Sequence, residues 1–352
     1  MRKLILGVAL GLTLTLSGAG IASGEPNDVP GQQPVPGPGP VLGAVFPATV
    51  QGAIHQKFAV AGAHDVTVSQ QLTQCNDLYG GLQKLLSPLA GMKDPEQLRC
   101  TNAFPHGPDS PIGVLYYYPT DLQEMAAAPA LVWVPGIDGD AGQYDDAARL
   151  WASRGFIVAI PYNFVNSTTT EHLWGTQALI QEEGRPGSPL HGKVDLSRVI
   201  LGGHSGGAGS LIYAASYLPP VQQLLDPRLR IVGALSVATG IQAPIGAAIT
   251  VPTLTITGTR DWVTAPFLWP YWAYATMFQA PAYSAPMVNG THLSINDDLP
   301  NNPAASLSMA WFEHLVGGNP EADAVFVGPQ WGLASDQAFV DVKRNAPADR
   351  LN

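Results

Sequence analysis

One serine of this chain stands in a setting that can make it a nucleophile. Residues 203–207 read Gly-His-Ser-Gly-Gly, a G-x-S-x-G pattern centred on Ser205. An apolar, β-branched run over 199–201 precedes it, and residues 208–217 can form a helix. A strand, a sharp turn and a helix in this order make a nucleophile elbow, whose glycines relieve the crowding around a strained serine. The chain has 38 glycines, so a plain glycine-rich loop is the alternative, and the flanking elements and downstream residues weigh against it.

The serine has candidate partners further along the chain. A serine hydroxyl is a weak nucleophile that needs a base, and the base needs an acid to orient it. After such an elbow the order is serine, acid, histidine. Asp261 follows a buried run that begins at residue 251, and His292 follows a short run over 286–288. Three predicted strand ends thus bring Ser205, Asp261 and His292 to one edge of a sheet, where ligand chemistry occurs in open α/β sheets. Alone, Asp261 could cap a helix and His292 could be a surface histidine.

Other acids and histidines have simpler interpretations. Asp226 and Asp297 are reserve candidates for the acid. His204 neighbours the serine, but its side chain is expected to leave the elbow in another direction and to pack. Three more histidines fall on helical or loop stretches and are expected to be structural or solvated: His172, His191 and His314.

Acyl transfer also needs two N–H donors for the oxyanion that develops. The residue after the serine, Gly206, supplies the first. The second is expected from the loop after the strand that ends at Val134, where a glycine permits a sharp turn and Ile137 follows it. Carboxylates would oppose a developing anion, so Asp138 and Asp140 are expected to point outward.

The elements that must position these residues alternate between strand and helix. Strands are expected over 112–118, 131–134, 156–160, 198–202, 231–237, 253–257 and 286–288, and helices over 144–153, 171–183, 208–217, 266–277 and 304–315. This alternation predicts an α/β fold with a mostly parallel central sheet and helices on both faces. Residues 53–69 alternate like a strand, residues 71–98 are mostly helical in pattern, and the tail predicts one short helix near 336–342.

The N-terminus predicts export. Arg2 and Lys3 precede an apolar stretch over 4–16 and a run of small residues, so residues 1–24 are interpreted as a signal peptide. A membrane anchor is the alternative, but the apolar stretch is short, and no other segment predicts a stable membrane span. Residues 25–43 are rich in proline and glycine and predict an extended linker. The folded domain is then expected over 44–318, with the tail 319–352 packed on or near it.

The composition narrows the range of possible binding partners. The formal net charge is −10 and charged residues make up only 12% of the chain, so clustered cations for nucleic acid are not expected. No metal-ligand spacing and no phosphate-binding loop stands out, so no cofactor is predicted. We expect a monomer. In an exported chain the two cysteines, Cys75 and Cys100, favour a disulfide over two buried thiols.

Several of these segments resemble bacterial cutinase-like polyester hydrolases of the α/β-hydrolase superfamily. They are PGIDG, SRGFIVAIPYN, KVDLSRVILGGHSGGAGS, VPTLTITGTRDWVTAP and NGTHLSIN. The resemblance spans roughly residues 110–316 and extends to chlorophyllase-like and dienelactone-hydrolase-like enzymes. It implies Ser205 as nucleophile, Asp261 as acid and His292 as base, with Ile137 and Gly206 as oxyanion donors. It also implies an open cleft with no large lid domain.

Departures from that resemblance bear on the substrate. Polyester hydrolases usually carry an aromatic residue at the position of Ile137 and a methionine at that of Gly206. The stretch that holds the two cysteines looks like an insertion, and the disulfide near the family's C-terminus is absent. Trp174 and Trp262 are the expected aromatics of the substrate cleft, followed by Phe267 and Trp269, and core packing is the alternative for each.

The predicted function is that of a secreted serine esterase, which forms an acyl-enzyme on a carboxylic ester, lipid or polyester. A non-catalytic binding protein of the same fold is one alternative, but such a relative would be free to lose one of the three residues. An amide or peptide hydrolase is another, although no charged specificity pocket or propeller domain is evident. Asn289-Gly-Thr291 forms a glycosylation sequon beside His292, where a glycan would obstruct the site, which favours a bacterial origin.

Overall fold

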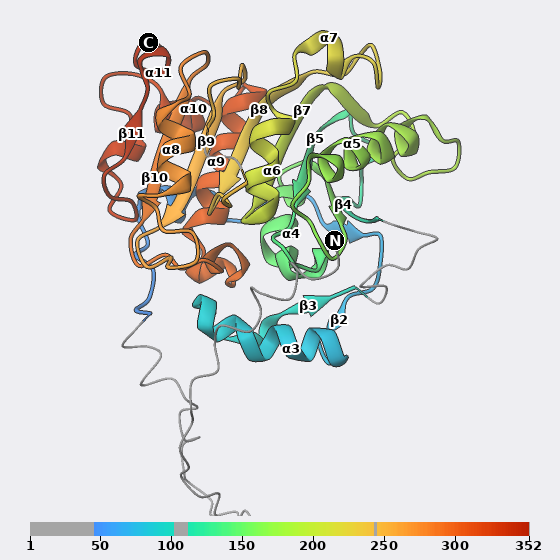
Figure 1. The fold of residues 1–352 in the computed structure, drawn as a ribbon. Helices are drawn as coiled ribbons and strands as arrows, with labels where there is room; N and C mark the ends of the chain where they lie inside the picture. Colours follow the sequence, from blue (N-terminus) through green and yellow to red (C-terminus); the bar gives the residue numbers. More distant parts are fainter. Residues whose placement is uncertain (1–45, 102–111, 243–244, 352) are drawn as a thin grey trace, which may run out of the picture. The chain divides into compact units, whose positions relative to one another are not determined.

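The computed structural model describes residues 46–101, 112–242 and 245–351 (Figure 1). Their main feature is a nine-stranded sheet in the order β1-β4-β6-β5-β7-β8-β9-β10-β11. Neighbours from β6 to β10 pair in parallel, whereas β1 with β4, β4 with β6 and β10 with β11 pair antiparallel. The strands are β1 (Val66–Val68), β4 (Gly113–Pro119), β5 (Ala128–Val134), β6 (Ile157–Tyr162), β7 (Val194–His204), β8 (Ile231–Val237), β9 (Thr253–Gly258), β10 (Ala282–Met287) and β11 (Lys343–Arg344).

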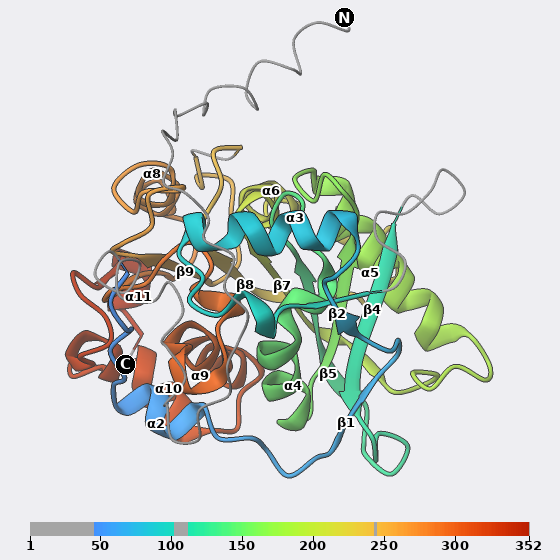
Figure 2. The ribbon, with the colours of Figure 1, turned by 90° about the horizontal axis from the view of Figure 1, so that it is seen from below.

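Helices cover both faces of this sheet (Figure 2). One face carries α5 (Thr169–Gly184), α6 (Gly206–Ala214) and α8 (Trp269–Ala275). The other carries α2 (Ala53–Phe58), α4 (Asp145–Ser153), α9 (Pro303–Val316) and α10 (Pro320–Phe326). Two more helices, α7 (Pro219–Gln222) and α11 (Ala346–Asp349), are only one turn long. The predicted α/β fold of the α/β-hydrolase type is therefore confirmed.

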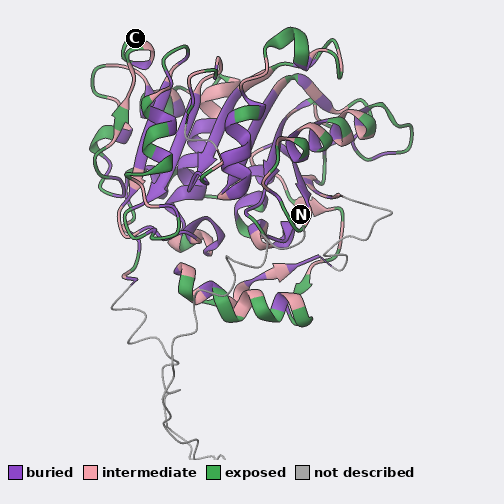
Figure 3. Cartoon of the chain, viewed as in Figure 1, coloured by how far each residue is buried: buried purple, intermediate pink, exposed green. Residues whose placement is uncertain are grey.

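The central strands are buried along their length, which explains their unbroken apolar runs. Every residue of β6 and β9 is buried, as expected where helices cover both faces of a parallel sheet. The core of the second face is built around Trp133, Trp151 and Trp311, which are fully buried (Figure 3). The indole N–H groups of Trp151 and Trp311 donate to the carbonyls of Ala305 and Ala234, whereas the indole nitrogen of Trp133 has no hydrogen-bond partner among the described residues.

Two predictions for the ends of the domain are wrong. Residues 53–69 do not form a strand but contain α2 followed by β1, because Ile54 and Phe58 lie one helical turn apart and both pack toward α9. The helix predicted near 336–342 is absent, because Asp336 there accepts hydrogen bonds from the N–H groups of Ile54 and Ala338. The tail forms α10 and α11 instead, each started by an asparagine cap and an early proline.

The stretch between the cysteines is also less helical than predicted. We call residues 71–101 the cap segment. It contains one helix of some length, α3 (Leu78–Leu86), two single turns of 3₁₀-helix (Ser87–Ala90 and Pro95–Gln97) and a hairpin of β2 (Thr73–Gln74) with β3 (Arg99–Cys100). Pro88 and Pro95 lie at the starts of the two 3₁₀ turns, and Gly91, whose φ is +97°, ends the first of them. Figures 1 and 2 show α3 lying across the carboxyl ends of the parallel strands.

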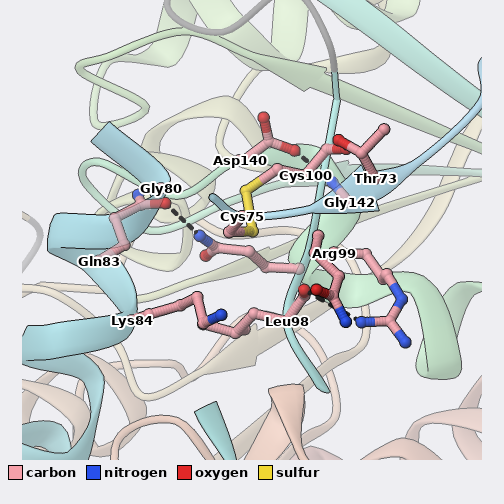
Figure 4. The surroundings of a disulfide bond; sticks show 12 residues. Thr73, Cys75, Gly80, Gln83, Lys84, Leu98, Arg99, Cys100, Asp140 and Gly142 are labelled. Atoms are coloured by element: carbon pink, nitrogen blue, oxygen red, sulfur yellow. Dashed lines mark hydrogen bonds between the residues drawn. A yellow bond between two sulfur atoms is a disulfide. The ribbon is translucent and has the colours of Figure 1, made fainter. Parts of the chain in front are cut away.

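The predicted disulfide between Cys75 and Cys100 is present and closes the two ends of the cap segment (Figure 4). Residues 238–252 join β8 to β9. The cap segment, and not this connection, lines the pocket beside Ser205, so the cleft is less open than the resemblance implies. The segments interpreted as signal peptide and linker lie outside the described residues. None of the helices in the described ranges is long and apolar enough to cross a membrane.

Candidate active site

Ser205 stands in a sharp turn between β7 and α6, as the G-x-S-x-G pattern predicts. Its φ of 52° and ψ of −115° are strained values for a residue with a side chain. The neighbouring glycines are required by space. A Cβ at Gly203 would lie 2.6 Å from the carbonyl carbon of Gly207, and one at Gly207 would lie 2.2 Å from the carbonyl oxygen of Val134. The turn therefore has room only for glycine at positions 203 and 207.

Asp261, His292 and Ser205 form one hydrogen-bonded chain. The serine hydroxyl lies 2.9 Å from Nε2 of His292, and Nδ1 of His292 lies 3.0 Å from Oδ2 of Asp261. Ser205 follows β7, Asp261 lies three residues past β9, and His292 lies in the loop after β10. Because these strands are neighbours or near neighbours in a parallel sheet, their carboxyl ends meet at one edge.

The acid is buried but remains ionised. Burial opposes the charge on Asp261, yet the bond to His292 and the charge that His292 can carry, together with hydrogen bonds from Thr264, hold the pKa of its carboxyl below the usual value. Oδ1 accepts the backbone N–H groups of Val263 and Thr264, and Oδ2 accepts the hydroxyl of Thr264 at 2.8 Å. Sequence reasoning missed Thr264. An Asx-type turn after a strand-end aspartate was the available signal.

The two predicted oxyanion donors lie close together. A Cβ at Gly206 would lie 3.3 Å from the backbone nitrogen of Ile137, which shows how closely the elbow approaches the loop after β5. The N–H of Gly206 starts α6 and so has no partner inside the helix. The N–H of Ile137 donates to no acceptor in the described part of the chain. Both groups are thus available to a ligand beside Ser205.

Two residues that the sequence reasoning missed fix the shape of this loop. The N–H of Gly136 donates to the hydroxyl of Tyr144 at 3.0 Å. The carbonyls of Gly136 and Gly139 accept the side-chain amide of Asn166 at 2.9 and 2.8 Å. Asn166 is fully buried with a φ of 46°, and it lies just after β6. An asparagine at a parallel strand end was its only signal in the sequence.

His204 does more than pack, which corrects the expectation for it. Its Nε2 lies 2.8 Å from the backbone carbonyl of His292, and its Nδ1 lies 2.8 Å from the hydroxyl of Tyr144. A carbonyl can only accept, so Nε2 carries the proton and Nδ1 accepts from Tyr144. Burial, aided by the charge of His292, lowers the pKa of His204 to about 3 and keeps it neutral. Through Tyr144, His204 therefore links the loop after β5, which carries Ile137 and which we call the oxyanion loop after its predicted role, to the loop of His292.

The reserve candidates do not join this chain. Asp226 pairs with Arg228 at 2.9 Å. Asp297 is buried, and burial raises its pKa to about 7, so it is poorly suited to balance a positive imidazole. The other histidines serve local structure: His172 with the carbonyl of Gly202, His191 with that of Glu183, and His314 with Asp323.

The predicted cleft aromatics lie at the surface. Trp174 on α5 is half exposed, and Trp262 is more exposed, with its indole N–H donating to the carbonyl of Leu89 in the cap segment at 2.8 Å. Phe267 and Trp269 are also exposed beside the loop of Asp261. None of the four lines the pocket that opens on Ser205. Their part in substrate binding stays a prediction.

The expectation that Asp138 and Asp140 point outward is wrong for Asp140. Asp140 is fully buried and accepts the N–H and hydroxyl of Thr101 at 2.9 and 2.7 Å and the N–H of Gly142 at 2.7 Å. Burial raises its pKa to about 6 despite these bonds. Asp138 is half-buried, and its carbonyl accepts from the side chain of Gln83 in α3. Both residues anchor the cap segment.

This arrangement can move a proton from a hydroxyl to an imidazole that a buried carboxylate orients, beside two N–H groups that can hold an anion. Within the described ranges, no group of three or more His, Cys, Asp or Glu side chains is placed to hold a metal ion.

A family model described as PET hydrolase-like (PETase) matches residues 111–340, more than half of the 352 residues. The matched range contains Ser205, Asp261, His292 and the two predicted oxyanion donors, and it begins after the cap segment. Among curated proteins none matches this chain.

Proposed function

Because the chain belongs to the PET hydrolase-like family, whose members are ester hydrolases of the α/β-hydrolase type, we propose that it is a secreted serine esterase acting through Ser205, His292 and Asp261. The observation that carries this proposal is the unbroken chain of hydrogen bonds from the serine hydroxyl through His292 to a buried, ionised Asp261. A protein that only binds ligands has no need of all three residues joined by hydrogen bonds.

Each residue has a defined task in the proposed reaction. Ser205 Oγ attacks the ester carbonyl carbon while Nε2 of His292 takes its proton. The N–H groups of Ile137 and Gly206 bind the oxygen that becomes negative. The alcohol leaves with the proton from Nε2, and a covalent acyl-enzyme remains. A water molecule, deprotonated by the same nitrogen, then releases the carboxylic acid and restores the serine.

Asp261 serves the base rather than the substrate. Its Oδ2 accepts Nδ1–H of His292, so the free electron pair of the ring stays on Nε2, which faces Ser205. Its negative charge stabilises the imidazolium that forms when the serine proton is transferred. The bonds from Val263 and Thr264 hold the carboxylate in place and ionised throughout the cycle.

Export is part of the same proposal. A positively charged start, an apolar stretch over 4–16 and small residues after it are typical of a signal peptide. The disulfide in the cap segment fits an oxidising compartment outside the cytoplasm.

The test is hydrolysis of p-nitrophenyl esters from acetate to palmitate by the mature protein, by Ser205→Ala and by Ser216→Ala. Ser216 is a matched control, because its hydroxyl donates to the carbonyl of Ile212 in α6 and Ser216 does not line the pocket beside Ser205. We expect Ser205→Ala to lose turnover by on the order of 10⁶-fold and Ser216→Ala to keep it. A fluorophosphonate should label the wild type at Ser205. Turnover retained by Ser205→Ala would mean another nucleophile, and a wild type that neither hydrolyses nor is labelled would be a binding protein.

A further inference from the structure

A pocket of about 370 Å³ opens on Ser205 and His292. Loop residues at the sheet edge line one side of it, and the cap segment lines the other with residues that include Leu82, Leu86 and Met92. Ligand pockets span about 300–1,000 Å³, so this one is at the small end of the range. It can take a small molecule, or one end of a larger one.

The wall that α3 presents is largely apolar, and its residues that line the pocket are Tyr79, Leu82, Gln83 and Leu86. Leu82 and Leu86 stand one turn apart and therefore share a face of the helix. Both line the pocket, and each remains 49% exposed. Leu85 lies on the outward side, is 71% exposed and does not line the pocket. Two leucines thus leave apolar surface uncovered beside the reacting atoms.

This wall is tied to the oxyanion loop. The side-chain amide of Gln83 donates to the carbonyl of Asp138, and Gln143 donates to Gln83 at 2.6 Å. At the other end of the cap segment, Thr101 donates twice to the buried carboxylate of Asp140. Two separate points of the cap segment are therefore fixed against the loop that carries Ile137.

It is tied equally to the loops of the acid and the base. Trp262, next to Asp261, donates to the carbonyl of Leu89 at 2.8 Å. Thr291, next to His292, donates to the carbonyl of Gly91 at 3.3 Å, and a Cβ at Gly91 would lie 2.3 Å from Cβ of Thr291. Contacts with all three loops make the cap segment a fixed part of the site.

The charges of the pocket favour a neutral occupant. Its lining within the described residues includes neither lysine nor arginine. A substrate arm that ends in a carboxylate would therefore meet no lysine or arginine to balance its charge. An uncharged hydrocarbon arm would instead cover Leu82 and Leu86 and gain about 25 cal/mol for each Å² of apolar surface removed from water.

We propose that the cap segment builds a binding pocket for one compact, neutral, apolar arm of the ester, which rests on the proposed function of Ser205. The arm is the acyl chain or the alcohol group, and both share this chemistry. A long polymer chain would have to continue through the wall formed by α3. The enzyme therefore prefers small neutral esters and chain ends over bonds in the middle of a polyester.

The experiment fills the pocket from α3. Leu86→Trp is compared with Leu85→Trp, which adds the same bulk to the outward side of the same helix. Two substrate series are measured: p-nitrophenyl esters from acetate to octanoate, and acetates of alcohols from methanol to octanol. We expect Leu86→Trp to lower kcat/KM for the longer members, relative to the shortest, by about tenfold or more in one series. That series identifies the arm. Leu82→Ala/Leu86→Ala should shift the optimum to longer members.

Calorimetric titration of Ser205→Ala with 2-octanone, which has no scissile bond, tests the pocket apart from the chemistry. We expect measurable binding, lost when Leu86→Trp is added and kept when Leu85→Trp is added. A p-nitrophenyl ester that carries a terminal carboxylate should be a poorer substrate than its neutral analogue of equal length. Identical profiles and identical 2-octanone binding for the two tryptophan variants would overturn the pocket proposal. A wild type without esterase activity or labelling would overturn the function alone.

Discussion

The proposed catalytic centre and the cap segment are built on opposite principles. Ser205, Asp261 and His292 follow buried strands of one sheet, and hydrogen bonds fix each of them in place. The cap segment has a small cluster of its own, made by the disulfide, Met92 and Leu98, and its helix leaves most of its leucines exposed (Figure 3).

The difference separates two tasks. The sheet edge sets the geometry that any ester needs at the reacting carbonyl, and a rigid scaffold holds it within tight limits. The cap segment contacts the loops that carry these residues, and it shapes the space around the rest of the substrate. Changes to the centre should therefore reduce turnover of all esters alike, whereas changes to the cap segment should alter the choice among them.

Among variants that keep Ser205, the largest effect should follow a change at the proposed acid. Asp261→Asn keeps the size of the side chain but removes the charge, and its amide would donate to Nδ1 of His292 and place the ring proton on the wrong nitrogen. We expect kcat to fall by about 10⁴-fold on every ester, with the order of preference among esters unchanged. Steady-state kinetics over the chain-length series checks this.

Asp226→Asn is the matched control for that variant, because Asp226 pairs with Arg228 away from the site. It should keep full activity. A fall of less than about tenfold for Asp261→Asn would assign the acid to another residue, and a changed chain-length profile would show that the centre and the cap segment are not separate.

The same division explains what could be predicted from the sequence. Long buried runs, such as those of β6 and β9, fixed the sheet, and the order of Ser205, Asp261 and His292 followed from where those runs end. The residues that support them were missed. Tyr144, Asn166 and His204 act through contacts between segments far apart in the chain, and a single sequence carries no sign of such contacts.

The cap segment was predicted poorly for a physical reason as well. The leucines of α3 lie outside the small cluster of Cys75, Met92, Leu98 and Cys100, so their spacing does not reflect packing on a core of the cap segment. Leu82 and Leu86 look like ordinary core positions of an amphipathic helix, yet they line the pocket. Asp140 looks like a solvated turn acid, yet it binds Thr101.

A middle-sized effect should follow removal of the disulfide. Its loop spans a sequence separation of 25 residues, and the chain-entropy model assigns such a bond about 3 kcal/mol. In Cys75→Ala/Cys100→Ala, we expect the amides of α3 to exchange faster with solvent while those of β7 keep their protection. Hydrogen exchange followed by mass spectrometry measures both in one experiment.

The kinetic consequence distinguishes the two regions. Turnover of p-nitrophenyl acetate should change by no more than about threefold, whereas the preference for one chain length should flatten, because the wall formed by α3 is no longer held in place. Equal loss on all esters would mean that the cap segment also positions the catalytic residues. Unchanged exchange in α3 would mean that the loop contacts alone hold it.

The smallest effect on turnover should come from Asp140, which joins the two regions. Burial raises its pKa to about 6 from an ordinary value of 3.8, so the folded protein holds this proton more tightly than the unfolded chain does. The resulting stabilisation is complete below pH 3.8 and is lost as the pH rises through about 6. Asp140→Asn should keep its bonds, since its amide can still accept from Gly142 and donate to Thr101.

We therefore expect the free energy of unfolding of Asp140→Asn, relative to the wild type, to rise by about 2 kcal/mol between pH 4 and pH 8, with turnover at pH 8 unchanged. Urea unfolding at a series of pH values measures this difference. Asp226→Asn should show almost no change over this range, because bonds from Arg228 lower the pKa of Asp226 below 3.8 and its titration lies below pH 4. Parallel curves for wild type and Asp140→Asn would mean that Asp140 is ionised in the folded protein. Thr101 and Gly142 would then bind an ionised Asp140 between the oxyanion loop and the cap segment, instead of a carboxyl that protonates near pH 6.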